Sequence, residues 1–322
     1  MDFLSNTGNP YNYYPNTAIG LCAIAYDDVA EIPPAVKSQT GLDVIWGPAE
    51  LTGWLGVAYS LVYLASNPAT GETWVVIRGT NPDSLYSWLD EDFDLSPTPA
   101  FNTLPGCPPG APDTALISQG TFNGMSDLIH LRDPATGTSI VEFLHAADPD
   151  FIYVTGHSLG GTLCAPLFAY LNAMLNGPGP ANSMALWSFA GLTPGGVGFN
   201  TYFNTVLIND QGFLWRLQNS LDIAPLMWWS RPRIEHIYDA HDLHWGIAEW
   251  APIDHLFATA QATGIGYSQP QTGLLMPGQF DDSIIDRNLW AAQAMHQHHT
   301  ATYQKLVRAH YPVTSPPQSA CA

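Results

Sequence analysis

The residues best placed to do chemistry lie in a glycine-rich run near the middle of the chain. Residues 156–161 read Gly-His-Ser-Leu-Gly-Gly and so contain the pattern Gly-x-Ser-x-Gly. A short apolar segment typical of a strand, 151–155, precedes this run, and a segment with helical character, 162–175, follows it. A serine on such a sharp strand-to-helix turn has its hydroxyl raised clear of the backbone. We therefore predict that Ser158 is a nucleophile.

The neighbours of this serine also suit a reaction that builds negative charge on an oxygen atom. Gly156 and Gly160 allow the turn to close and a substrate to approach, because they carry no side chain. Leu159 should begin the helix, so its N–H points to the place where an oxyanion would form. Gly-x-Ser-x-Gly also recurs by chance in glycine-rich loops, but the flanking strand and helix distinguish this example.

A serine alcohol needs a base to take its proton, and the base needs a carboxylate to orient it. In serine hydrolases built on a parallel sheet, the acid and then the histidine follow the serine along the chain. Asp222 fits the acid, because it comes just past a strand-like segment that ends near residue 219. The alternative is a turn aspartate that caps the loop before Pro225.

The base must come later still, where histidines are plentiful. Three of them crowd into residues 296–299, beside a helix-like segment at 300–309. We predict that one of the three is the base. His241, His244 and His255 are alternatives that we interpret as partly buried structural residues. Two histidines of the cluster share a helical face, as metal ligands would, but no carboxylate accompanies them at ligand spacing, so we predict no metal site.

The surrounding segments predict a mostly parallel sheet that is covered by helices on both faces. Turn-rich residues at 67–71, between predicted strands at 56–64 and 74–78, indicate a hairpin. Buried apolar strands that alternate with helices are typical of an α/β sheet. Strands are predicted at 56–64, 74–78, 151–155, 184–190 and 213–219, and helices at 17–26, 121–131, 139–147, 162–175 and 300–309.

The composition favours a globular protein that does not bind nucleic acid. Hydrophobic residues make up 46% of the 322-residue chain, which supports a sizeable core. The formal net charge of -19 comes from 9 basic against 28 acidic residues, so the acidity reflects missing bases. Phosphate binding needs clustered Lys and Arg, which excludes nucleic acid as a partner. An acidic surface of this kind also repels anionic lipid, or simply keeps the protein in solution.

Cysteine usage and hydropathy indicate neither a disulfide scaffold nor a membrane anchor. Cys164 is predicted to be a buried thiol, and Cys107 and Cys321 are available for one bridge. The N-terminus lacks the basic and apolar regions of a signal peptide. The most apolar stretches, 51–65 and 161–175, are too short to be transmembrane segments. The compartment is unknown from the sequence, with secretion slightly favoured over the cytoplasm.

Taken together, the motifs resemble those of the class 3 lipase family of α/β hydrolases. Gly-x-Ser-x-Gly alone is widespread, but an Arg-Gly-Thr strand end combined with an Asn-x-x-Asp-x-x-Pro block is far more selective. The resemblance extends over residues 17–307. Its blocks, in order, are residues 75–80 (Val-Val-Ile-Arg-Gly-Thr), 156–161, 219–225 (Asn-Ser-Leu-Asp-Ile-Ala-Pro) and 299–303 (His-Thr-Ala-Thr-Tyr).

The resemblance implies an α/β-hydrolase fold and a role for each site residue. Ser158 would be the nucleophile and Asp222 the orienting acid. His299 would be the base, because it alone in its cluster has a tyrosine four residues later, as in the family. Thr80 matches the family's oxyanion residue, whose N–H and hydroxyl join the N–H of Leu159. A β-branched hydroxyl residue at a strand end offers both donors from one rigid position.

The implied activity is that of a serine ester hydrolase, a lipase or carboxylesterase that cleaves apolar esters such as acylglycerols. It would need no cofactor, and its partner would be an apolar ester at an oil–water interface. Phospholipid, feruloyl ester and polyester are alternative substrates for the same triad. A non-catalytic binding protein is a further alternative, but it would be marked by loss of the serine, acid or histidine, and all three are present.

We expect a single domain over residues 1–322 with two additions. A lid is predicted at 82–118, because lids of the family follow the oxyanion strand. Alternating aspartates at 90–94 resemble part of a calcium loop, but its glycine and closing glutamate are missing, so we interpret them as solvated acids. An aromatic-rich insertion at 226–290 would supply an acyl pocket, a cap or further core.

Overall fold

The computed structural model describes residues 13–52, 58–79, 94–177, 183–204, 213–244, 246–270, 273–286 and 288–312. Its centre is a seven-stranded sheet in which the strands follow one another in chain order. The first three strands pair antiparallel, and those from β3 to β7 pair parallel. The strands are β1 (Asp43–Thr52), β2 (Ala58–Asn67), β3 (Glu72–Ile77), β4 (Phe151–His157), β5 (Met184–Phe189), β6 (Phe213–Asn219) and β7 (Gly273–Met276).

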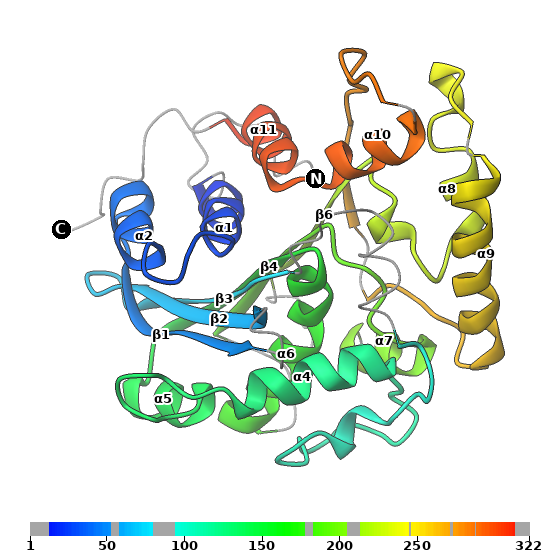
Figure 1. Ribbon diagram of the computed structural model, residues 1–322. Coiled ribbons are helices and arrows are strands. Elements are labelled where there is room, and N and C mark those ends of the chain that lie inside the picture. The colour runs from blue at the N-terminus through cyan, green and yellow to red at the C-terminus, as the bar shows by residue number, and fades with distance from the viewer. Residues whose placement is uncertain are drawn as a thin grey trace.

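Helices cover both faces of this sheet, and a separate group lies to one side (Figure 1). One face carries α1 (Tyr13–Ile24), α2 (Ile32–Thr40) and α11 (Thr300–His310). The other carries α4 (Gln119–His130), α5 (Ile140–Ala147) and α6 (Leu159–Asn176). The remaining elements are η2 (Phe101–Thr103), α7 (Val197–Tyr202), η4 (Ala224–Leu226), α8 (Arg231–Glu235), η5 (Asp239–His241), α9 (Ile247–Ala262) and α10 (Leu289–His298).

Buried apolar side chains form one cluster on each face of the sheet and a third beside it. The α6 face contains Val75, Val154 and Phe168, whereas the α1 face contains Val76 and Tyr153. Successive strand residues point to opposite faces, so a strand with helices on both sides must be apolar at every position. The third cluster joins η4 and α9 to α10, which places it around the end of the sheet where β6 leads into a loop.

All five predicted strands are present, with ends that differ by a few residues, and the fold class is confirmed. The hairpin pairs Asn67 with Glu72 across the predicted turn. The sequence analysis missed β1 and β7. Register shifts interrupt β1 near Trp46 and Ala49, beside a glycine and a proline, which obscure the alternation of a strand. β7 has only four residues and lies at an edge, with Leu275 54% exposed.

The described part of the predicted lid segment, 82–118, packs onto the body of the protein. Phe101 and Leu104 are fully buried in the cluster beneath α4 and α6. Residues 80–93 lie outside the described residues, so the lid itself stays a prediction. In the aromatic-rich segment, 226–290, Trp228 is 5% exposed within the third cluster and therefore belongs to the core.

Three cysteines are free thiols, of which Cys22 and Cys164 are buried and Cys107 is exposed. Cys321, the predicted partner of Cys107, lies outside the described residues. Burial raises the pKa of the Cys22 thiol to about 12 and that of Cys164 well above its usual value, so both are protonated at neutral pH. Over the described ranges, no helix is long and apolar enough to cross a membrane.

Candidate active site

Ser158 occupies the turn between β4 and α6, with φ 61° and ψ -126°. A non-glycine residue with positive φ costs on the order of 1–3 kcal/mol and persists only where its surroundings impose it. Two hydrogen bonds do so here. The Ser158 N–H donates to the Phe189 carbonyl at 3.1 Å, and the Thr162 N–H donates to the Ser158 carbonyl at 2.9 Å. The strand-to-helix turn that the sequence predicts is therefore present and strained.

Two glycines make room for this turn, because backbone packs where their side chains would be. A Cβ on Gly156 would lie 2.5 Å from the carbonyl carbon of Gly160. A Cβ on Gly160 would collide with the Ile77 carbonyl oxygen of β3. The first turn of α6 thus rests directly against the ends of two neighbouring strands, which fixes the direction of the Ser158 side chain.

The imidazole of His298 lies against the Ser158 hydroxyl. Its Nε2 is 2.8 Å from Ser158 Oγ, and its Nδ1 is 3.1 Å from Asp222 Oδ2. A carboxylate only accepts hydrogen bonds, so Nδ1 carries the hydrogen and Nε2 is left to accept the serine proton. All three side chains are buried. This is the arrangement that a serine, histidine and aspartate need to act together.

The structure contradicts the prediction that His299 is the base. His299 is exposed and lies between α10 and α11, where its Nδ1 accepts the Ala301 N–H at 3.1 Å and caps α11. His296 also points elsewhere, with its Nε2 3.6 Å from Asp281 Oδ2. His298 is the last residue of α10, and the backbone direction at that junction sends its ring toward Ser158. Within the predicted cluster, the histidine that contacts Ser158 is therefore His298, one position before the residue chosen from the sequence.

Asp222 is 1% exposed and satisfies its carboxylate with hydrogen-bond donors. The Ala224 N–H donates to Oδ1 at 2.9 Å, and the Tyr303 hydroxyl donates to Oδ2 at 2.7 Å. Burial, followed by the charge of Asp222, raises the pKa of Tyr303 well above its usual value, so this hydroxyl stays a donor. The tyrosine used to choose among the histidines therefore contacts the acid.

A buried amide pair joins the acid loop to the base. The Asn219 Nδ2 donates to both the carbonyl oxygen and Oε1 of Gln297 at 2.8 Å. The Asn219 Oδ1 accepts the Leu221 N–H at 3.1 Å, which shapes the loop toward Asp222. Because Gln297 directly precedes His298, this pair fixes the acid and the base relative to each other. The sequence analysis placed Asn219 in the Asn-x-x-Asp-x-x-Pro block but gave neither amide a role, since their contact spans 78 positions.

An oxyanion could meet donors at the start of α6. Leu159 is the first residue of that helix, so its N–H has no intrahelical acceptor. Gly79 lies close by, because a Cβ there would be 2.9 Å from Ser158 Cβ. Thr80, the predicted second donor, lies outside the described residues. Its neighbour Gly79 places the segment after β3 against Ser158.

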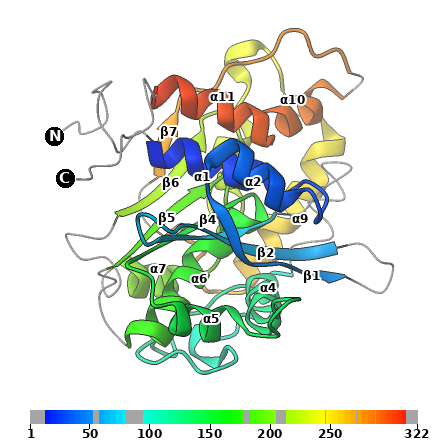
Figure 2. The same cartoon turned by 90° about the vertical axis from the view of Figure 1, so that its left-hand side faces the viewer.

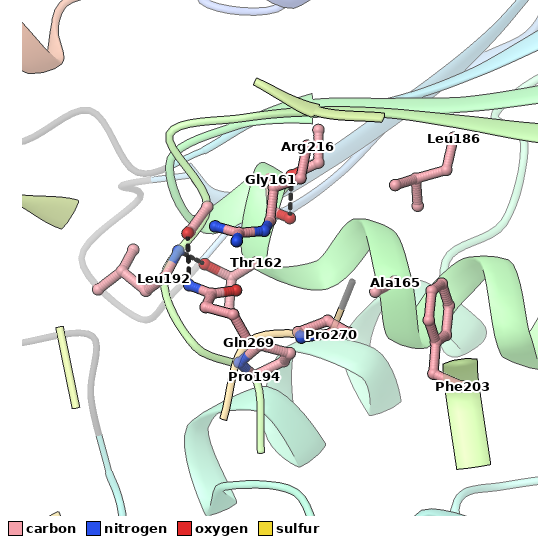
Figure 3. Close-up of a pocket in the computed structure, with 12 residues that line it drawn as sticks. Gly161, Thr162, Ala165, Leu186, Leu192, Pro194, Phe203, Arg216, Gln269 and Pro270 are labelled. Atoms are coloured by element: carbon pink, nitrogen blue, oxygen red, sulfur yellow. Dashed lines mark hydrogen bonds between the residues drawn. The ribbon is translucent and has the colours of Figure 1, made fainter. Parts of the chain in front are cut away.

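Figure 3 shows a cavity behind the first turn of α6, lined by Gly161, Thr162, Arg216 and Gln269. Its volume of about 10 Å³ suits one water molecule and is too small for an acyl chain. The Thr162 hydroxyl accepts the Leu192 N–H at 2.9 Å, and Gln269 donates to the Gly191 carbonyl at 3.1 Å. These bonds tie the loop after β5 to the helix that carries the nucleophile's turn.

A larger cavity of about 310 Å³ lies among α4, α5 and α6. It is lined by residues such as Leu167 and Met174, which are two to four helical turns from Ser158 along α6. Neither cavity is lined by a residue of the Ser158, His298 and Asp222 group. Among the residues that the structure describes, no group of three or more His, Cys, Asp or Glu side chains could hold a metal ion.

The central sheet and the helices that flank it have the α/β-hydrolase fold. Three solved structures share this fold. One is the M37 lipase, with 24% identity, TM-score 0.72 and 92% of each chain covered. Another is Lip2 lipase from Yarrowia lipolytica, with 18% identity, TM-score 0.56 and coverage of 87% of this chain and 82% of that one. The third is a triacylglycerol lipase from Penicillium expansum, with 15% identity, TM-score 0.51 and coverage of 85% and 81%.

Part of the sequence also matches a known family. Residues 74–229 match the lipase (class 3) family, and this segment runs from β3 through the nucleophile turn to the acid loop. This segment, just under half of the chain, is thus similar to the class 3 lipases, and the match supports an ester hydrolase. The resemblance recognised in its motifs is confirmed, and so is the fold that it implies.

Proposed function

We propose that this protein hydrolyses apolar carboxylic esters, acylglycerols among them, through an acyl-enzyme on Ser158. One observation carries the proposal. The His298 imidazole bridges the Ser158 hydroxyl and the Asp222 carboxylate, at 2.8 Å and 3.1 Å, in the tautomer that accepts a proton from serine.

The chemistry begins when the Ser158 oxygen attacks the ester carbonyl carbon and its proton moves to His298 Nε2. The carbonyl oxygen takes the negative charge and accepts hydrogen bonds from the Leu159 N–H and, in our proposal, from Thr80. Collapse of this intermediate breaks the bond to the alcohol, which leaves with the proton from His298. The acyl group is then bonded to Ser158.

A water molecule completes the cycle. His298 takes one proton from it as its oxygen attacks the acyl carbon, and a second tetrahedral intermediate forms at the same oxyanion donors. When that intermediate collapses, Ser158 regains its proton from His298 and the carboxylic acid departs. Asp222 keeps the imidazole oriented and stabilises its positive charge at both steps.

The surface charge bears on which esters the protein meets. With 9 basic residues against 28 acidic ones, the chain should adsorb poorly to anionic lipid surfaces. We therefore propose neutral esters as substrates. Triglyceride emulsions, phosphatidylcholine vesicles and a feruloyl ester, assayed side by side with p-nitrophenyl esters, rank the candidate substrates. Faster turnover of phosphatidylglycerol vesicles, which are anionic, than of the triglyceride emulsion would contradict this choice.

The test of the activity is Ser158→Ala, assayed on p-nitrophenyl butyrate and on a triglyceride emulsion. We expect loss of about 10⁶-fold in kcat, because the base then has no alcohol to activate. A fluorophosphonate probe should label the wild-type protein once and the variant not at all. Circular dichroism and the unfolding midpoint serve as the folding control. Turnover that survives in the folded variant would refute the proposal.

A further inference from the structure

His157 lies directly before the nucleophile, yet its contacts lead to the base. Its side chain is buried at the end of β4, and its ring centroid is 4.9 Å from that of His298. We propose that His157, locked in one tautomer by Tyr26, is a positioning residue that holds His298 in register with Ser158. This inference rests on the function proposed above and adds two residues to it.

The first contact is a hydrogen bond from the His157 ring to the backbone of the base. His157 Nε2 is 2.7 Å from the carbonyl oxygen of His298. A carbonyl only accepts, so Nε2 carries a hydrogen, and in the neutral ring Nδ1 then carries none. Tyr26 meets that need, because its hydroxyl is 3.1 Å from His157 Nδ1 and donates to it. The tautomer of the neutral ring is therefore set from both sides.

This hydrogen bond acts where the backbone of the base is least constrained. His298 ends α10, and carbonyls in the last turn of a helix have no intrahelical partner. His299 then turns the chain directly into α11. The His157 bond fixes the peptide plane between the two helices, and that plane sets the direction from which the His298 side chain leaves the backbone. Figure 2 shows α10 and α11 following each other along the face that carries α1.

Tyr26 extends the same link to the oxyanion strand. It lies just past α1, and a Cβ on Gly79 would collide with its hydroxyl oxygen. That oxygen therefore rests against the backbone of the residue before Thr80. Through Tyr26 and His157, the N-terminal helix region contacts the oxyanion strand, the nucleophile turn and the base, which are far apart in the sequence.

The reaction requires His157 to stay uncharged. His298 becomes an imidazolium during each acyl transfer, and a second positive charge about 5 Å away would oppose that state. Burial, and then the neighbouring His298, lowers the pKa of His157 well below its usual value. The other groups that act on this ring are the Tyr26 hydroxyl, the Tyr303 ring and His299, whose charge would lower the pKa of His157 further.

The experiment compares four variants in the full chain, with kcat referred to sites titrated by the fluorophosphonate. His157→Leu removes the donor, and His157→Gln keeps an N–H donor near the position of Nε2. Tyr26→Phe removes only the hydroxyl that sets the tautomer. Tyr170→Phe is the matched control, because its hydroxyl donates to the Pro105 carbonyl at 3.0 Å, far along α6.

We expect kcat to fall about 10-fold to 100-fold in His157→Leu and several-fold in Tyr26→Phe, with KM within about twofold, because one buried hydrogen bond orients the base. His157→Gln should recover most of the loss, and Tyr170→Phe should match the wild type. A merely structural role would lower the unfolding midpoint of all four variants and leave kcat per titrated site unchanged.

Wild-type kcat in Tyr26→Phe and in folded His157→Leu would overturn the inference, and so would a failure of His157→Gln to recover activity. If His157→Leu does not fold, Tyr26→Phe and His157→Gln decide. The proposed function fails separately, when the wild-type protein neither hydrolyses esters nor reacts with the probe at Ser158.

Discussion

The two halves of the candidate site are held by different kinds of interaction. The nucleophile half, residues 151–162, is contiguous in sequence and rests on backbone packing, with Gly160 against β3 and the strand paired on both sides. The acid–base half, residues 219–225 and 297–303, is assembled from side-chain hydrogen bonds between segments about 80 positions apart. Adding an atom should therefore disturb the nucleophile half, whereas removing a hydrogen-bond donor should disturb the acid–base half.

The sharpest test of the acid–base half exchanges two adjacent histidines. His298→Ala should lower kcat by about 10⁶-fold, because Ser158 then has no base. His299→Ala should stay within about threefold, since its ring only caps α11, although the lost cap lowers the free energy of unfolding by up to about 1 kcal/mol. Steady-state rates and urea unfolding of both proteins provide the measurement. An inactive His299→Ala beside an active His298→Ala would reverse our assignment.

The same contrast explains how far the sequence could lead. Ser158 and its turn were predictable, because a strand, two glycines and a helix are all local signals. The strands β3 to β6 were also predictable, since each is a short apolar run between turn signals. No local signal of this kind distinguishes His298 from His299, because the two residues are neighbours at the junction of α10 and α11.

What separates the two histidines is tertiary. The carbonyl of His298 accepts from His157, and Gln297 is held by Asn219. Both contacts join residues that no local pattern relates. The tyrosine spacing selected His299, but Tyr303 contacts Asp222, so its distance along the chain says little about which imidazole is the base. Contacts between residues so far apart in the sequence can be identified only from a structure that places their segments together.

The nucleophile half should fail when a single methyl group is added. In Gly160→Ala the new Cβ would meet the Ile77 carbonyl, which is backbone and cannot move aside cheaply. We expect a loss of about 2–3 kcal/mol in the free energy of unfolding, and a fall in kcat as β3 and the turn separate. Gly20→Ala is the control, because nothing lies within 4 Å of its Cβ and alanine favours a helix. Equal stability of the two variants would contradict the close packing inferred here.

The acid–base half should respond to the loss of a single oxygen atom. Tyr303→Phe removes the hydroxyl that donates to Asp222 at 2.7 Å and keeps the ring that packs beneath it. A hydrogen bond to a buried carboxylate is worth about 1.5–3 kcal/mol, so kcat should fall about 10-fold while KM changes little. Tyr63→Phe, which loses a bond to the Leu21 carbonyl, is a matched control for stability. Equal kcat in the two variants would show that Asp222 is oriented without the tyrosine.

The last expected effect is a pH dependence of stability and concerns His157, which belongs to the nucleophile half by sequence and to the acid–base half by contact. Burial and then His298 hold the pKa of His157 well below its usual value. Below about pH 6.5 the unfolded chain binds a proton that the folded chain refuses, so stability falls as the pH drops, and above that pH the group contributes no slope.

For one group this slope reaches about 1.4 kcal/mol per pH unit. His157→Gln should remove it and give a flatter dependence of unfolding free energy between about pH 6.5 and 4.5, measured by urea titration. His145→Gln, an exposed change on α5, should keep the wild-type slope. Identical slopes in all three proteins would mean that His157 takes up its proton in the folded state as readily as in the unfolded chain. A charge would then form beside His298, and the neutral link between the two halves would be lost at mildly acidic pH.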